Sequence, residues 1–335
     1  MSYSKKADPR VERLIQDAVD GIHATLEASP EASAIRAVVL GGGYGRGEGG
    51  ATPDGMPYND MDFFVVMNGR KPSPALRGLL DGLSAEWGGR LSIEIDFYCV
   101  KSLRSLYKDA DTLMIQELFA GCRVVFGDAH IFDDAPRRPF SDLPWTEAAR
   151  LLLNRGAGLL FARERMSDPA EADFVRRNLH KTALGCGDAI LVVHHDYRTT
   201  GTERLEALRK YYEASWLIPA YEDALSFKYT PKVGKGPDYA HHLDCWLRTM
   251  TLVATEITRH IASADAHFSA CRIAEAGPRS LKSMILSICS APVLPELLFP
   301  LAVHPRIKLL RLLTACLLDP EHRTGTFIRL WKRYN

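Results

Sequence analysis

A change of periodicity near residue 141 constrains the fold of this chain more than any other feature. Before it, short apolar runs rich in β-branched residues alternate with amphipathic stretches, as strands and helices alternate in an α/β unit. Beyond Ser141-Asp142-Leu143-Pro144 the strand pattern fades and long helical periodicities follow. The sequence therefore predicts an α+β protein, with an N-terminal α/β head built on a small mixed sheet and an all-helical C-terminal bundle.

At 335 residues the chain is long enough for two separate cores. We divide it into an N-terminal helix over residues 1–30, an α/β head over 31–140 and a helical bundle over 141–335. Strands are expected at 35–40, 63–67, 91–100 and 123–126, and helices of the first half at 9–28, 76–87 and 112–120. Helices of the second half are expected at 146–166, 170–193, 203–227, 243–261, 281–288, 306–318 and 326–332.

The composition excludes several classes of protein. A net charge of +1 offers no overall attraction to nucleic acid, and no apolar run approaches the length of a membrane span. The first residues lead into a charged helix rather than an apolar signal core. The seven cysteines are scattered singly without a Cys-x-x-Cys pair, which is typical of reduced thiols. We therefore expect a cytoplasmic protein without structural zinc.

A glycine-rich run, GGGYGRGEGG, occupies residues 41–50, where the first strand of the head ends. Successive glycines let backbone amides turn into one concavity that binds phosphate oxygens, although a mobile loop would have the same composition. The dinucleotide pattern is excluded because a proline-containing loop follows and Arg70 stands where a ribose-binding acid belongs. No Gly-Lys-Ser/Thr ending is present, which excludes a Walker A loop.

Two carboxylates, Asp60 and Asp62, begin the strand that continues as Phe63-Phe64-Val65-Val66. Residues two apart on a strand point the same way, so both carboxylates are expected on one face and Met61 on the other. Two like charges this close favour a cation between them, and Mg²⁺ prefers carboxylate and phosphate oxygens. A solvated acidic edge is the alternative, and the apolar residues that follow argue against it.

A third carboxylate is expected from the strand over residues 91–100, where Glu94 and Asp96 share one face. A third acid completes a second metal site and accepts a proton from an attacking hydroxyl. Only one of the two is needed, and the alternation leaves the choice open.

These residues together resemble the nucleotidyltransferase superfamily, which includes DNA polymerase β, the minimal nucleotidyltransferases and the aminoglycoside nucleotidyltransferases. The family pattern is a strand, Gly-Gly or Gly-Ser, then Asp-x-Asp or Asp-x-Glu, and a third acid on a later strand. Residues 43–48 are also similar to the Arg-Gly-Glu turn of the minimal enzymes. The resemblance covers residues 35–127. Sixteen residues separate Gly43 from Asp60, more than in the family, so an inserted turn is expected at 51–58.

The resemblance implies roles for individual residues. Two Mg²⁺ ions would be held by Asp60, Asp62, Glu94 and Asp96, and the phosphates of ATP or another nucleoside triphosphate by Gly42, Gly43, Gly45 and Arg46. The third-acid strand is similar to that of kanamycin nucleotidyltransferase, in which the Glu is the general base. This similarity favours Glu94 over Asp96 as the base. Polymerase-β-like members instead use an Asp followed by apolar residues, which Asp96 fits, so both residues stay candidates. Arg46 and Glu48 are also candidates to pair with each other and shape the turn.

The helical half resembles the acceptor-binding bundle of aminoglycoside-type enzymes only in general pattern. Lys181, in the basic helix over 170–193, is a candidate to neutralise the triphosphate, as a lysine of the helical domain does in several relatives. A solvated lysine is the alternative. Asp188 is a candidate to bind the acceptor or to pair with Arg177 or another base. The pairs His194-His195 and His241-His242 are expected in core or surface positions, because adjacent helical residues point in different directions.

The sequence thus predicts a Mg²⁺-dependent nucleotidyltransferase. It would move a nucleoside monophosphate, AMP from ATP, to a hydroxyl of a small-molecule acceptor and release pyrophosphate. The acceptor is not identified, and neither nucleic acid nor membrane is expected as a partner. Two alternatives stay open: a protein adenylyltransferase that modifies Tyr, Ser or Thr, and a non-catalytic nucleotide-binding or antitoxin-like module.

Overall fold

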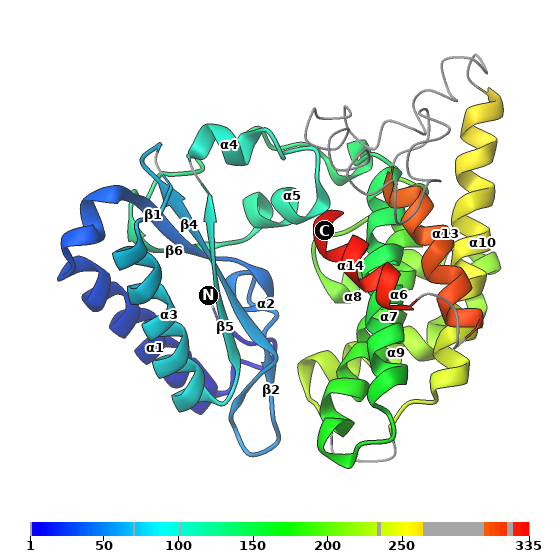
Figure 1. The fold of residues 1–335 in the computed structure, drawn as a ribbon, viewed down its shortest axis with the longest axis horizontal. Helices are drawn as coiled ribbons and strands as arrows, with labels where there is room; N and C mark the ends of the chain where they lie inside the picture. Colours follow the sequence, from blue (N-terminus) through cyan, green and yellow to red (C-terminus); the bar gives the residue numbers. More distant parts are fainter. Residues whose placement is uncertain are drawn as a thin grey trace. The chain divides into compact units, whose positions relative to one another are not determined.

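The computed structural model describes residues 2–69, 71–100, 102–232, 236–263, 305–319 and 324–334 (Figure 1). The chain forms two compact units. The first comprises Met1–Pro139 and Ser226–Gly234, and the second Phe140–Leu225 and Lys235–Asn335. The predicted α+β class is confirmed, with a small mixed sheet in the first unit and helices in the second. Within the described part of the chain, no helix is long and apolar enough to span a membrane.

The sheet of the first unit has the strand order β5-β4-β1-β6. Its members are β1 (Ile35–Leu40), β4 (Asp60–Met67), β5 (Glu94–Val100) and β6 (Arg123–Gly127). β1 pairs antiparallel with β4 and β6, whereas β4 and β5 are parallel and need the crossover helix α3 (Pro74–Leu91) between them. The expected inserted turn is a small hairpin of β2 (Gly50–Ala51) and β3 (Pro57–Tyr58).

One face of the sheet packs against α1 (Pro9–Glu27) and α3. Asp8 caps the first turn of α1 by accepting hydrogen bonds from two backbone amides, and the buried stripe of α1 follows helical spacing. Met61, Phe63 and Val65 of β4 point into this core and are fully buried. Each such side chain contributes about 1.5–3 kcal/mol when it leaves water.

The predicted end of α3 is wrong. The sequence predicts an end at residue 87, before Gly88 and Gly89, but the helix continues to Leu91 and is capped by Ser92, which has a left-handed φ of 57°. Leu91 is 1% exposed, and its burial favours another helical turn over an end at the glycines.

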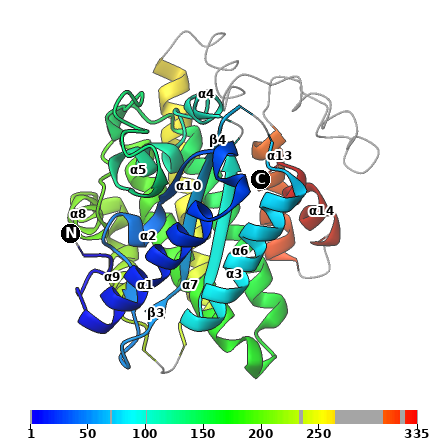
Figure 2. The same ribbon diagram turned by 90° about the vertical axis from the view of Figure 1, so that its left-hand side faces the viewer.

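The opposite face of the sheet packs against α4 (Leu103–Tyr107) and α5 (Leu113–Ala120) (Figures 1 and 2). This second core contains Val39, Phe64 and Val66 from the strands, together with side chains of the two helices: Leu106, Ile115, Leu118 and Phe119. Because side chains alternate along β4, Asp60 and Asp62 belong to the same face as Phe64. The predicted carboxylates therefore lie on the same face of the sheet as the residues that pack against α4 and α5.

The second unit is helical, as predicted. Its principal helices are α6 (Thr146–Arg165), α7 (Ala172–Val193), α10 (Tyr239–Ser263), α13 (Pro305–Leu318) and α14 (Thr324–Tyr334). Small residues allow close packing, since a Cβ on Gly156 would come within 2.7 Å of the Trp246 ring. The Trp246 ring nitrogen donates to the Leu152 carbonyl at 2.9 Å. The helix predicted at 281–288 lies outside the described residues.

The single helix predicted at 203–227 is wrong. The structure has α8 (Gly201–Leu208), a 3₁₀ segment (Tyr212–Leu217) and α9 (Ile218–Tyr229). Thr200 and Glu203 form a capping box that starts α8. Pro219 lacks an amide hydrogen and is tolerated only in the first turn of a helix, so a new helix begins at Ile218.

Two buried histidines make the stability of the second unit depend on pH. His180 is 5% exposed and His242 is 4% exposed, with ring centroids 6.4 Å apart. Burial lowers the pKa of His180 to about 4, with Asp223 opposing it and His242 and Arg176 adding to it. Burial likewise lowers the pKa of His242. The folded protein thus binds fewer protons here than the unfolded chain.

We expect stability to be complete above the unfolded histidine pKa of about 6.5 and to fall as the pH is lowered toward about 4. By pH 5 the loss from His180 alone should be on the order of 2 kcal/mol. Urea unfolding at pH 7.5 and at pH 5, monitored by circular dichroism, measures this loss in the free energy of unfolding. His180→Gln should flatten this pH dependence, whereas His130→Gln, at an 82% exposed side chain, should not. Equal pH profiles for wild type and His180→Gln would contradict the assignment.

Candidate functional site

The structure brings the four predicted acids together on one face of the first unit's sheet. β4 and β5 run in parallel with Asp60 opposite Glu94 and Asp62 opposite Asp96. Within each strand, the residue between the two acids faces the core: Met61 of β4 is 0% exposed and Ile95 of β5 is 5% exposed. Neighbouring strands lie about 4.8 Å apart, so the acids form a two-by-two array.

The charges of this array act on one another. The pKa of Asp96 is raised by partial burial, by Glu94 and by Asp60. The pKa of Tyr98 is raised by burial and by all four carboxylates, with Asp62 the strongest of them. Tyr98 was missed in the sequence, although the alternation that linked Glu94 to Asp96 extends to it. Tyr98 is 48% exposed, and its ring centroid lies 5.6 Å from that of Phe64.

The donor set suits a hard divalent cation, because crowded carboxylates supply the oxygen ligands that Mg²⁺ prefers. Burial is the main cause of the raised pKa of Asp96, and the neighbouring carboxylates of Glu94 and Asp60 add to it. Across the residues that the structure describes, however, no three His, Cys, Asp or Glu side chains converge closely enough to hold an ion as they stand. Metal binding therefore stays a prediction.

The glycine run contacts this array directly. Its first amide, that of Gly41, donates to the Asp62 carbonyl at 2.8 Å. Gly42 has a φ of +58°, and a Cβ there would lie 2.4 Å from the Asp62 carboxylate oxygen Oδ2. Gly42 through Gly45 form the short helical turn α2 (Gly42–Gly45). The predicted phosphate-binding glycines and the second aspartate are thus immediate neighbours.

Close packing, rather than mobility, accounts for the glycines of this run. A Cβ on Gly45 would lie 2.4 Å from the Leu40 carbonyl oxygen, and one on Gly49 would lie 2.2 Å from the Tyr44 ring. Tyr44 is 2% exposed, and its hydroxyl donates to the Gly50 carbonyl and accepts from the Tyr58 amide, both at 2.8 Å. The run is therefore an ordered turn anchored to the hairpin.

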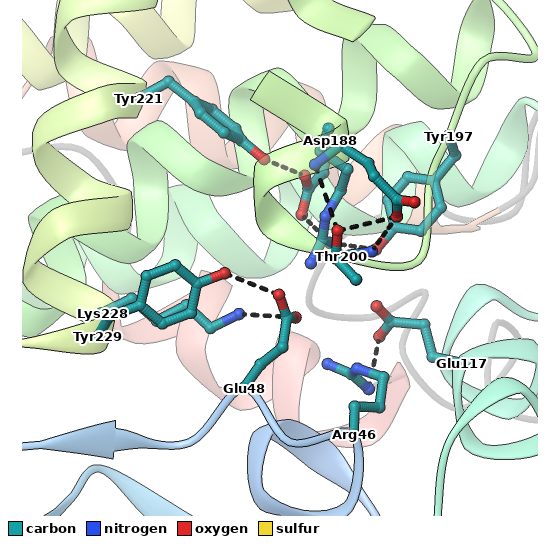
Figure 3. Close-up of polar contacts among 11 residues, drawn as sticks. Arg46, Glu48, Glu117, Asp188, Tyr197, Thr200, Tyr221, Lys228 and Tyr229 are labelled. Carbon is teal, nitrogen blue, oxygen red and sulfur yellow. Dashed lines mark hydrogen bonds and ion pairs between the residues drawn. The ribbon is translucent and has the colours of Figure 1, made fainter. Parts of the chain in front are cut away.

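The two charged residues of the run have separate partners. Arg46 pairs with Glu117 of α5 at 3.6 Å, with 10% of the arginine side chain exposed. Glu48 accepts a hydrogen bond from the Tyr229 hydroxyl at 2.7 Å and lies 3.4 Å from the Lys228 ammonium (Figure 3). The sequence offered these two residues as a mutual pair, and nothing in their spacing pointed to partners so distant in the chain.

The predicted residues of the helical half lie in the second unit. Lys181 is partly buried in the middle of α7. Asp188, also on α7, accepts hydrogen bonds from Arg204 at 3.0 Å and from the Tyr221 hydroxyl at 2.9 Å (Figure 3). Of the basic partners that the sequence left open for Asp188, the structure has Arg204, whereas Arg177 pairs with Asp173. Asp188 thus belongs to an internal polar network of this unit.

No protein-family model matches the chain, and no curated protein sequence matches it significantly.

Proposed function

We propose that the protein is a Mg²⁺-dependent nucleotidyltransferase that moves a nucleoside monophosphate, AMP from ATP, to a hydroxyl of a small-molecule acceptor. One observation carries the proposal: the array of Asp60, Asp62, Glu94 and Asp96 on β4 and β5, with Gly42 packed against the Asp62 carboxylate. Acids in such an array suit metal-assisted phosphoryl chemistry, and an ordered glycine turn suits close approach of phosphates.

Each part of the array has a role in the proposed reaction. The backbone at Gly42 and Gly43 receives the phosphates, and Asp60, Asp62 and Asp96 are the residues that would hold the metal. Bound Mg²⁺ would neutralise phosphate charge and orient the triphosphate. Glu94 takes the proton from the acceptor hydroxyl, whose oxygen attacks the α-phosphorus as the bond to the pyrophosphate oxygen breaks.

The resemblance gives Lys181 the role of adding positive charge for the triphosphate. A lysine with this role stabilises negative charge that grows on the leaving phosphates. Arg46 is a weaker candidate for phosphate than the sequence indicated, because binding phosphate would compete with its ion pair to Glu117.

The two candidates for the base are distinguished by isosteric replacement. We expect Glu94→Gln to lower kcat by about 10²–10⁴-fold with little change in the Mg²⁺ concentration needed for half-maximal rate, because it removes a proton acceptor. Asp96→Asn should raise that Mg²⁺ requirement as well, because it removes an anionic ligand. Rates measured across a Mg²⁺ titration test both. The reverse pattern would exchange the two roles.

The proposed function is tested by pyrophosphate release. The protein is incubated with Mg²⁺ and each nucleoside triphosphate in turn, with pooled metabolites as the source of acceptor hydroxyls. We expect pyrophosphate only when a triphosphate and the metabolite pool are both present, and a labelled small product from α-labelled ATP. A labelled protein band instead would favour the protein adenylyltransferase alternative. Nucleotide binding without pyrophosphate release under any of these conditions would favour the non-catalytic module.

A further inference from the structure

A buried carboxylate ties the glycine run to a segment 180 residues later in the chain. The side chain of Glu48 is 2% exposed, and Tyr229 and Lys228 supply its hydrogen bond and its ion pair (Figure 3). The segment Ser226–Gly234 that carries both partners belongs to the same compact unit as the run. Burying a carboxylate is costly unless it is paired, so these contacts hold the two segments together.

The backbones of the two segments also meet. A Cβ on Gly50 would lie 2.5 Å from the Lys228 carbonyl oxygen, a distance that only glycine permits. The Phe227 ring packs edge-on against Tyr58 of the hairpin, with ring centroids 5.7 Å apart. The segment Ser226–Gly234 therefore packs against the end of the glycine run through both backbone and side-chain contacts.

Glu48 in turn contacts the residues predicted to bind phosphate. Its backbone amide donates to the Gly43 carbonyl at 2.7 Å. Gly42, next in the chain, packs against the carboxylate of Asp62. A series of direct contacts therefore leads from the Tyr229 hydroxyl through Glu48 and the glycine turn to the acidic array.

We propose that Glu48 is a positioning residue for nucleotide binding, and that Tyr229 and Lys228 hold it in place. The buried carboxylate keeps the turn at Gly42 and Gly43 in the shape that receives the phosphates of a nucleoside triphosphate. This inference rests on the proposed function. It assigns part of the nucleotide site to a segment that the sequence placed in the helical half.

The test is the affinity of full-length protein for α,β-methylene-ATP with Mg²⁺, measured by titration calorimetry. Tyr229→Phe removes the hydroxyl that bonds to Glu48 and should raise the Kd about tenfold. Tyr211→Phe is the matched control, because it removes a hydroxyl that donates to the Asp196 carboxylate at 3.4 Å within the second unit. Its Kd should equal that of the wild type.

A second variant and a local readout separate positioning from general stability. Glu48→Gln keeps an acceptor for Tyr229 but loses the charge that pairs with Lys228, and should also weaken binding. In both variants, amide hydrogen exchange should quicken at residues 42–49 while circular dichroism shows a folded protein. If Tyr229→Phe does not fold, Glu48→Gln and Lys228→Met decide the question.

The outcomes also separate this inference from the proposed function. If the wild type binds the nucleotide and the folded variants bind it equally well, the positioning role is overturned and the proposed function stands. Lower thermal stability with unchanged Kd would likewise overturn it, since the contact would then be only structural. If the wild type binds no nucleotide, both proposals fail together.

Discussion

Replacing Asp62 by asparagine is expected to lower the rate of pyrophosphate release by roughly 10³-fold or more. Asparagine preserves the shape of the side chain but removes the negative charge that would hold the metal beside the phosphates. The same replacement at Asp60, the other acid of the strand, should have a similar effect. Steady-state rates with saturating ATP and Mg²⁺ measure both.

In the Asp60 and Asp62 variants, thermal stability should stay the same or rise although activity falls. The pKa of Asp96 is raised mainly by burial and further by the charges of Glu94 and Asp60, so removing a charge from these crowded carboxylates should relieve some repulsion. Thermal unfolding in EDTA should occur at the wild-type temperature or above it. Asp81→Asn, at an exposed position of α3, is the matched control and should change neither quantity. Asp60 and Asp62 variants that both retain transfer would exclude this site.

Gly42→Ala is expected to lower activity by about 10²-fold, because even a displacement of about 1 Å in a catalytic group has an effect of this size. The new Cβ would stand 2.4 Å from Oδ2 of Asp62, a distance that atoms do not tolerate, so the carboxylate must move. The φ of +58° adds about 1–2 kcal/mol of backbone strain for alanine. Steady-state kinetics and thermal unfolding together measure the two effects.

A glycine without neighbours provides the comparison. A Cβ on Gly82, inside α3, would meet no atom within 4 Å. Gly82→Ala should therefore keep full activity and stabilise the protein by up to about 1 kcal/mol, since alanine is the better helix former. If Gly42→Ala were as active as Gly82→Ala, the contact between the glycine turn and Asp62 would have no part in catalysis.

Much of the first unit follows from local pattern. The alternation of Glu94 and Asp96 with Ile95 predicted which side chains would face away from the core, and Ile95 is indeed buried. The β-branched run at 35–40 and the spacing of apolar residues over 9–28 likewise predicted β1 and α1. These features depend on side-chain direction within one element, which the backbone geometry of a strand or helix dictates.

The failures have identifiable causes. Apolar residues keep helical spacing across residues 203–227, so the sequence predicts one helix. The backbone restriction at Pro219 divides this stretch into separate helices. Gly88 and Gly89 favour a helix end by local propensity, but the burial of Leu91 extends α3 past them. The aromatic side chain of Tyr98 by itself favours a buried strand position, yet the residue is 48% exposed on the face of the acids.

By itself, the sequence determined most of the strands and helices of the first unit and the face on which each acid stands. Only the tertiary structure decided the pairing of Asp60 with Glu94 and of Asp62 with Asp96, because register between strands depends on how α3 returns the chain. It also decided the partner of Glu48. Tyr229 lies 181 residues away, and a contact at that separation arises from packing in three dimensions, which no local period records.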